Sequence, residues 1–334
     1  MTNARALILI ALCALGATAV SALLPEYYAG IVLAIGINAL LAVSLNVVNG
    51  ITGQFSLGHA GFMAVGAYTA AYLATGPLAG LFANPALGQL GVALCLMAAA
   101  LLAGAAGWLV GLPSLRLRGD YLAIVTLGFG EIIRVALLNS DSLGGARGFI
   151  GVPAFPGHSG APWVFGLLGL SLAACVRVMG SSHGRALLSI REDEIAAEAL
   201  GVDTTRYKVG AFVASAAGAL FAFTYSFLHP SSFNFMKSVE IVVMVVLGGM
   251  GSMSGAVLAA ALLTVLPEGL RPLKELTGVD LRMVIYSLAL VLLMLYRPGG
   301  LMGRREIWQI RFRKPLLNPP PPPDGGTSPQ RGEG

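Results

Sequence analysis

The chain has 334 residues, of which 56% are hydrophobic and only 11% are charged, and its mean hydropathy is +0.78. This composition excludes a water-soluble domain with an ordinary polar exterior. The formal net charge of +5 would suit a nucleic-acid partner, but the basic residues cluster at the ends of hydrophobic runs, where membrane topology explains them better. The sequence therefore predicts an all-α polytopic membrane protein that lies in the lipid bilayer and binds no nucleic acid.

About ten hydrophobic segments follow one another as candidate transmembrane helices for a bilayer core of about 30 Å. The expected spans cover residues 6–24, 29–48, 60–75, 89–112, 121–139, 163–179, 209–228, 239–247, 256–267 and 281–296. The first could instead be a cleaved signal peptide, because Arg5 precedes it and small residues lie near its end. We favour a retained helix, since another apolar span follows almost at once. The second span carries the polar residues Asn38, Ser44 and Asn46.

Glycines interrupt the hydrophobic signal after the second span, in a stretch that we call the first glycine segment (Gly50–Gly58). Irregular backbone at membrane depth persists only where protein or a water-filled cavity satisfies its amide groups. The pattern predicts a broken helix, with an ordinary short cytoplasmic turn as the alternative. His59 follows the segment, and we expect a satisfied polar residue there rather than a metal ligand, because no other ligand-type residue has suitable spacing.

A second glycine segment (Gly248–Gly255) interrupts the later half of the chain in the same way. The pattern G-x-x-G-x-x-S occurs in both, and corresponding glycine-interrupted segments point to an internal repeat and to the substrate path of a transporter. The candidate path residues are Gly50, Gly53, Ser56, Gly58, Gly248, Gly251 and Ser254. Because the chain holds 44 glycines, a chance match is the alternative.

Two ionisable residues lie within the fifth span. Glu131 and Arg134 are three positions apart, close enough to pair on one helix face. Ionisable residues inside a span are functional candidates by default, and a purely structural pair explains them equally well. The three cysteines (Cys13, Cys95 and Cys175) lie inside apolar runs without metal-type spacing, so we expect no metal site.

The longest densely charged run between two spans is the polar segment 183–208. Ser189 and Glu192 have the S-x-x-E spacing of a capping box, which predicts a helix from about Ile190, and Gly201 is suited to end it. We expect Arg191, Glu194 and Glu198 on one face of this helix, opposite an apolar face made of Ile195, Ala196, Ala199 and Leu200. A solvated hairpin between two membrane helices is the alternative.

Positive charge orients the chain if both the segment 183–208 and the basic stretch 297–314 are cytoplasmic. Four spans separate the two stretches, so both termini would be cytoplasmic, as would Arg116 and Arg118. We divide the chain into a transmembrane permease domain over residues 1–316 and a Pro-rich tail over residues 317–334. A five-proline run followed by Gly and polar residues predicts disorder in the tail.

Five stretches of sequence carry a resemblance to a known family. They are LNVVNGITGQFSLGHAGFMAVGAY (45–68), DYLAIVTLGFGEIIR (120–134), GRALLSIREDEIAAEALGVDTTRYK (184–208), MVVLGGMGSMSGAVLAA (244–260) and PGGLMG (298–303). The chain resembles the LivM-type permease of high-affinity branched-chain amino acid ABC importers, and permeases for urea and short amides are similar over the same stretches. Residues 194–201 resemble the EAA-type loop that docks such permeases on their ATPase.

The resemblance implies an inner-membrane translocation subunit that moves Leu, Ile or Val into the cytoplasm of a bacterium. It implies a second, LivH-like permease, two ATP-binding subunits and a periplasmic binding protein as partners. The implied ATPase-coupling residues are Ser189, Arg191, Glu194, Ala196, Glu198, Ala199 and Gly201. No G-x-x-x-x-G-K-[ST] phosphate loop occurs, so ATP and Mg²⁺ would be used by the partner ATPases, and we expect neither catalytic residues nor a cofactor in this chain. A self-sufficient secondary transporter using Glu131 and Arg134 is the alternative of another class.

Overall fold

The computed structural model describes residues 24–114, 120–156, 160–202 and 219–271, together with 287–288, 291–292, 295–297, 299–303 and 306. Several predictions lie outside these residues. They concern nearly all of the first span, Arg116 and Arg118, the start of the span 209–228, most of the span 281–296, and the tail 317–334.

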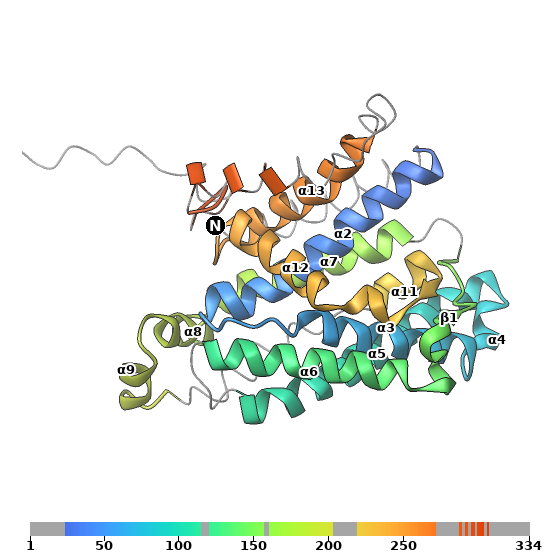
Figure 1. Ribbon diagram of the computed structural model, residues 1–334, viewed down its shortest axis with the longest axis horizontal. Helices are drawn as coiled ribbons and strands as arrows, with labels where there is room; N and C mark the ends of the chain where they lie inside the picture. Colours follow the sequence, from blue (N-terminus) through green and yellow to red (C-terminus); the bar gives the residue numbers. More distant parts are fainter. Residues whose placement is uncertain are drawn as a thin grey trace, which may run out of the picture.

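The described residues are almost entirely helical, as Figure 1 shows. The helices are α2 (Glu26–Asn46), which continues into the π-helix η1 (Val47–Ile51), α3 (His59–Thr75), α4 (Ala79–Phe82), α5 (Pro85–Ser114), α6 (Asp120–Leu138), α7 (Gly160–Met179), α8 (Ser182–Glu192), α9 (Glu194–Ala199), α11 (Ala219–Tyr225), α12 (Phe235–Gly248) and α13 (Met253–Gly269). Within this part of the chain, four helices are long and apolar enough to cross a membrane: Glu26–Ile51, Leu87–Gly111, Tyr121–Leu138 and Gly160–Met179. The prediction of an all-α polytopic membrane protein is therefore confirmed.

The long helices run between two ends of the molecule, seen at the left and right of Figure 1. The α9 end carries α8 and α9, and the β1 end carries α4 and a small antiparallel sheet of β1 (Phe149–Ile150) and β2 (Phe227–Leu228). In the described part of the chain, three 3₁₀ turns connect longer elements: η2 (Asp141–Leu143), η3 (Gly145–Arg147) and η4 (Pro230–Phe233). The span predicted to reach residue 228 is wrong at its end: α11 stops at Tyr225, and Ser226 takes a positive φ of 52° before β2 pairs with β1.

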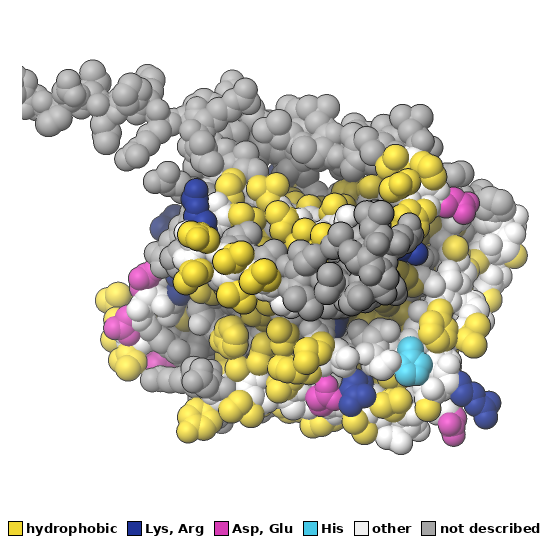
Figure 2. Space-filling view, turned by 45° about the horizontal axis from the view of Figure 1, so that its top comes forward, with side chains coloured by type: hydrophobic (Ala, Val, Ile, Leu, Met, Phe, Trp, Pro, Cys, Tyr) yellow, Lys and Arg dark blue, Asp and Glu magenta, His cyan; other side chains and the backbone are white. Residues whose placement is uncertain are grey.

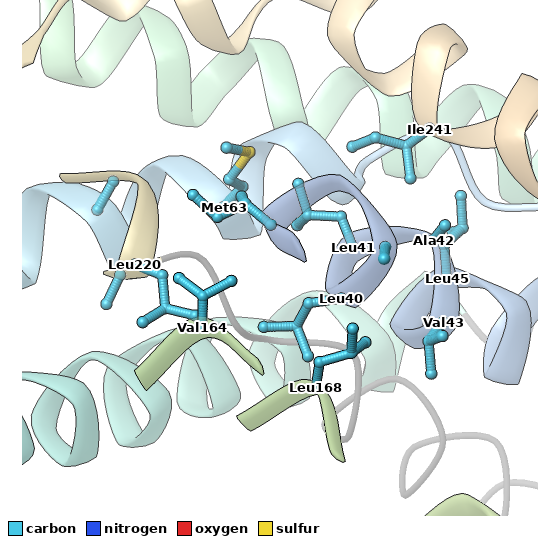
Figure 3. Packing of buried hydrophobic residues seen from close by; sticks show 14 of the residues in the cluster. Leu40, Leu41, Ala42, Val43, Leu45, Met63, Val164, Leu168, Leu220 and Ile241 are labelled. Atoms are coloured by element: carbon cyan, nitrogen blue, oxygen red, sulfur yellow. The ribbon is translucent and has the colours of Figure 1, made fainter. Parts of the chain in front are cut away.

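The centre of the bundle is the second half of α2, which packs against α7, α12 and α13. Figure 3 shows side chains of α2 meeting Met63 of α3, Val164 and Leu168 of α7, and Ile241 of α12. Between membrane helices the driving force is close packing, because lipid tails are as apolar as leucine, and small residues allow helices to approach. On α3 the side chains of Ala64 and Ala67 are completely buried. Small residues thus fix how closely these helices lie.

The outer helices differ from α2 in burial. Most of α2 is enclosed by its neighbours, whereas α6 and α7 expose most of their length. Hydrophobic side chains cover much of the face in Figure 2, and charged side chains lie mostly near its margins. Large apolar faces of this kind on membrane-length helices suit contact with lipid or with another membrane subunit.

Candidate functional site

The two glycine segments lie against each other at the α9 end, although they are far apart in sequence. Asn46, in the last turn of α2, connects them: its Oδ1 accepts a hydrogen bond from the Gly251 amide at 2.9 Å, and its Nδ2 donates to the Ser252 carbonyl at 3.0 Å. A Cβ atom at Gly50 would overlap the Gly251 nitrogen, so this approach requires glycine there. Gly251 itself has a φ of +92°, which L side chains rarely adopt. The predicted broken helices are therefore confirmed, and the two glycine segments pack directly against each other.

Side chains from neighbouring helices satisfy the irregular backbone of the first glycine segment. The Asn49 Oδ1 accepts from the Ser56 amide at 3.2 Å, and the Thr126 Oγ1 of α6 accepts from the Leu57 amide at 3.1 Å. The Ser238 Oγ of α12 accepts from the Ala60 amide at 3.1 Å, at the start of α3. Buried protein donors and acceptors are what irregular backbone needs at membrane depth. The segment is therefore packed against neighbouring helices over most of its length, and the short cytoplasmic turn stays an alternative.

His59 opens α3 and is buried, with its Nε2 2.8 Å from the Ser44 Oγ. The Ser44 hydroxyl donates to the Leu41 carbonyl, so the imidazole nitrogen donates to the hydroxyl oxygen. Among the described residues no group of His, Cys, Asp and Glu side chains could hold a metal ion. His59 therefore has the structural role expected for a satisfied polar residue.

Gln54, within the first glycine segment, is a polar residue that the sequence analysis did not single out. Its side chain is only 6% exposed, and neither amide atom has a hydrogen-bond partner in the part of the chain that the structure describes. Leaving such a group unsatisfied costs about 1–3 kcal/mol, so each case in a native protein needs an explanation. A polar partner from outside the described residues would therefore be favourable here, because it could bond the Gln54 amide.

The segment 183–208 differs from its prediction in one important respect. The single helix expected from Ile190 to Leu200 is two helices, α8 and α9, separated at Asp193, where the backbone is extended (φ −155°, ψ 108°). Asp193 caps α9, because its Oδ1 accepts from the amides of Ile195 at 2.9 Å and Ala196 at 3.1 Å. The predicted capping box at Ser189 is wrong: this hydroxyl lies inside α8 and donates to the Ala186 carbonyl.

Gly201 ends α9 as predicted. Its φ is +85°, its amide donates to the Glu198 carbonyl, and the Val202 amide donates to the Ala197 carbonyl. These two bonds form the Schellman arrangement, in which glycine takes the left-handed position. The boundary is thus fixed by local chemistry.

The prediction that Arg191 shares one helix face with Glu198 is wrong. The Arg191 side chain is 17% exposed and turns into the bundle, where Nη1 donates to the Gly50 carbonyl at 2.9 Å. The guanidinium also borders the second glycine segment, since a Cβ at Gly251 would lie 3.3 Å from Nη1. The break at Asp193 is the reason, because it ends the helix that would have aligned the two residues. Arg191 therefore connects α8 to both glycine segments.

The predicted apolar face of α9 is open. Ile195 is 64% exposed and Leu200 is 84% exposed, and Ala196, Ala199 and Glu198 are exposed beside them. The side chain of Glu194 lies outside the described residues. No contact in the structure bears on the ATPase-coupling role of these residues, which stays a prediction.

Most of the predicted path residues are enclosed in this structure. Ser56 is 2% exposed and Ser254 is 7% exposed, while Gly53 is the exposed member of the set. Gly50, Gly58 and Gly248 are buried, and Gly251 is partly buried. Their place in a translocation path also stays a prediction.

Glu306 is a functional-site neighbour that the sequence analysis missed. It is 9% exposed, its Oε1 accepts from the Met253 amide at 2.7 Å, and its Oε2 accepts from the Ser254 amide at 3.0 Å and the Ser254 hydroxyl at 2.5 Å. An anion is favourable at the start of a helix, where unpaired amides and the helix dipole meet it. Just before it, the amides of Leu301 and Met302 donate to the last carbonyls of α12, at Leu247 and Gly248. We call residues 299–303 together with Glu306 the C-terminal strap, because their contacts tie α12 to α13.

An ion pair on the membrane-length helix α6 has a counterpart on the shorter helix α12. Arg134 Nε is 2.6 Å from Glu131 Oε2 on α6, so the predicted pair does form. A second pair, Lys237 and Glu240 on α12, has the same spacing and an Nζ to Oε2 distance of 3.0 Å. It was missed because the predicted span began at Val239, although the i, i+3 spacing of opposite charges was visible in the sequence. A helical ion pair contributes only about 0.2–0.5 kcal/mol, whereas each charge at mid-membrane costs about 2.5–3.5 kcal/mol on insertion scales.

A bundle of membrane-length helices, with two packed glycine segments and an exposed helix beside them, defines the class of transporter subunits that span the membrane. The chain belongs to one family of that class: the family model described as branched-chain amino acid transport system / permease component matches residues 27–296. The LivM-type resemblance is thereby confirmed, and the chain is an integral membrane protein.

Named relatives agree with this family. The chain is 40% identical over 300 residues to the high-affinity branched-chain amino acid transport system permease protein LivM of Salmonella typhimurium, covering 79% of this chain and 67% of that protein. It is 26% identical over 294 residues to the permease protein LivH of Escherichia coli, covering 81% and 93%. A probable LivM of Methanocaldococcus jannaschii is 28% identical over 262 residues, covering 70% and 74%. No solved structure matches the chain.

These findings separate the alternatives left open by the sequence. The family is one of permease components, which are transporters rather than enzymes of the usual kind, and its members work within multi-subunit systems. Neither a urea or short-amide permease nor a self-sufficient secondary transporter is favoured.

Proposed function

We propose that this chain is the translocation subunit of an ATP-driven importer that moves Leu, Ile or Val into the bacterial cytoplasm. In this assembly a second, LivH-like permease completes the passage, two ATP-binding subunits use ATP and Mg²⁺, and a periplasmic binding protein delivers the amino acid. The chain itself binds no cofactor and lies in the cytoplasmic membrane. Family membership and the names of the relatives support the substrate class.

The observation that carries the mechanism is the position of Arg191. Its guanidinium bonds the Gly50 carbonyl and borders Gly251, so a displacement of α8 reaches both glycine segments through one side chain. On the other side of Asp193, α9 presents Ile195 and Leu200 to a partner. Docking of an ATPase on α9 would therefore move α8 and, through Arg191, the glycine segments. This requires the α9 end, and with it both termini, to be cytoplasmic.

The glycine segments are the proposed moving part of the passage. They are packed in this structure, with Asn46 bonding Gly251 and Ser252, and their glycines allow the backbones to approach and to turn. Coupling between two sites needs an element with two arrangements that both sites bias. Closed glycine segments are one such arrangement, and the ATPase cycle would supply the other.

Co-purification with a tagged chain tests the assembly: a second permease and two ATPase subunits should accompany it, and liposomes holding the complex should take up leucine only with ATP and binding protein. Replacing Ala199 by Trp tests the docking face, because a bulky indole on an exposed small residue blocks a close contact. We expect this variant to insert normally, lose its ATPases and lose uptake. Ala199→Ser, which keeps the residue small, should behave as the parent. Full uptake by Ala199→Trp would overturn docking on α9.

A further inference from the structure

A partly buried polar cluster lies where α2, α12 and α13 meet. The Lys237 Nζ donates to Glu240 Oε2 at 3.0 Å and to Asn38 Oδ1 at 3.3 Å, and the Asn38 Nδ2 donates to Thr264 Oγ1 at 2.9 Å. One ammonium group thus joins its own helix to α2, and the amide of Asn38 continues the network to α13. The cluster is distinct from the glycine segments, which lie at the α9 end.

Helix geometry places this cluster well away from the glycine segments. At a rise of about 1.5 Å per residue, Lys237 lies about 16 Å along α12 from Gly248, and Thr264 lies about 16 Å along α13 from Met253. Asn38 lies about 12 Å along α2 from Asn46, which bonds the second glycine segment. All three therefore lie at a distance from the glycine segments that is roughly half the thickness of a 30 Å hydrocarbon core.

The ion pair of Lys237 and Glu240 contacts Asn38 on one side, and its other side is partly exposed. The Lys237 side chain is 18% exposed and the Glu240 side chain is 37% exposed. Within the described residues, Lys237 uses two of its three donor hydrogens and Glu240 Oε1 accepts no hydrogen bond. Charges within a membrane bundle face a protein interior or a water-filled cavity rather than lipid. The open side of the pair is thus suited to a charged or strongly polar ligand.

We propose that Lys237 and Glu240 form a subsite for the charged backbone groups of a free amino acid, on its way through the membrane. The substrate's α-carboxylate pairs with the Lys237 ammonium, and its α-ammonium pairs with the Glu240 carboxylate. This inference rests on the proposed function and adds to it the residues that contact the substrate. A zwitterion is the ligand class that fits, because inserting it between the two partners replaces one ion pair by two and leaves no charge unpaired.

The apolar side chain of the substrate needs no ion pair or hydrogen bond. The apolar residues of the bundle offer a passage for branched aliphatic groups, and recognition of those groups can remain with the binding protein. Asn38 and Thr264 act as positioning residues, since they hold the ammonium group on the α2 side while its open side meets the ligand. The subsite thus favours amino acids in general over molecules without both backbone charges.

The chain offers a matched control in Glu131 and Arg134 on α6. That pair has the same i, i+3 spacing and similar exposure, 36% and 27%, and in the described residues its two charged groups contact only each other. For a pair whose members serve only each other, removing both charges is less harmful than removing one. We expect Glu131→Gln with Arg134→Gln to take up leucine better than either single variant.

The test uses the complete importer in liposomes, with leucine-loaded binding protein at saturation, and measures leucine taken up per ATP hydrolysed. Lys237→Gln and Glu240→Gln should each lower this ratio at least tenfold, with ATPase stimulation by the loaded binding protein within twofold of the parent. The double variant should be no better than the worse single one, unlike the α6 control. Recovery in the double variant would show a mutual pair and overturn the subsite.

Conservative variants and the uptake of the parent complex distinguish loss of the subsite from loss of assembly or of transport itself. If a neutral variant does not co-purify with its partners, Lys237→Arg and Glu240→Asp are compared instead. A lowered uptake ratio with intact assembly supports the subsite, and parental ratios in both overturn it. Failure of the parent complex to take up leucine with ATP would instead defeat the proposed function, so the two proposals fail by different results.

Discussion

Replacing Arg191 by Met should uncouple ATP hydrolysis from transport while leaving the fold intact. Methionine keeps much of the length of the side chain and removes the donors that bond the Gly50 carbonyl at 2.9 Å. A hydrogen bond from a charged donor contributes about 1.5–3 kcal/mol, and the lower part of this range applies because the side chain is 17% exposed. About 1.4 kcal/mol corresponds to a factor of ten. We therefore expect about a tenfold fall in leucine uptake per ATP hydrolysed.

The assay compares uptake and binding-protein-stimulated ATPase activity in the same liposomes. Arg185→Met is the matched control, because Arg185 lies on the same helix and is exposed. It should match the parent in both measurements. Arg191→Lys should lie between, since it keeps the charge and loses the planar fork of donors. An unchanged uptake ratio in Arg191→Met would refute the idea that this side chain transmits movement from α8 to the glycine segments.

Two further predictions concern the glycine segments and their strap. Cysteines placed at Ser56 and Ser254, in a background without native cysteines, should be protected from small water-soluble thiol reagents in the resting complex, because both positions are buried. The same cysteines should become reactive during ATP turnover. Protection throughout the cycle would show that the glycine segments serve only helix packing. Glu306→Gln should lower the thermal stability of the purified complex. The carboxylate oxygen Oε2 accepts two hydrogen bonds at the start of α13, and an amide NH₂ in its place would donate instead, at a cost of about 1–3 kcal/mol. Glu306→Asp tests whether charge alone suffices, and a melting temperature equal to that of the parent in Glu306→Gln would contradict the capping role.

Much of the fold could be predicted because its signals are local. Hydropathy places the four membrane-length helices of the described residues, and the helix ends at Gly201 because glycine accepts the left-handed backbone there. The pair of Glu131 and Arg134 follows from helical spacing alone. Each of these predictions depends on residues within about two turns of one another. For these features the sequence and the structure agree.

The long-range contacts could not be predicted, because nothing local specifies which helix faces which. In lipid every apolar face is an equally good neighbour, so pairing is decided by small residues and by a few polar partners. Asn46 was visible as a polar interruption, yet its partners Gly251 and Ser252 lie about two hundred residues further on. Glu306 caps α13 from a segment after the last span, and its only local signal was a single acidic residue beside two arginines.

The wrong capping residue in the segment 183–208 has a physical cause that bears on mechanism. Ser189 and Asp193 are both good N-caps, so local chemistry permits a helix start at either. The structure uses Asp193, and α8 continues through Arg191 to Glu192, which allows the guanidinium to bond Gly50. One continuous helix would instead have pointed Arg191 along the face of Glu198. The break makes α8 a part of the bundle and leaves α9 free to follow a partner, and a coupling element needs both properties.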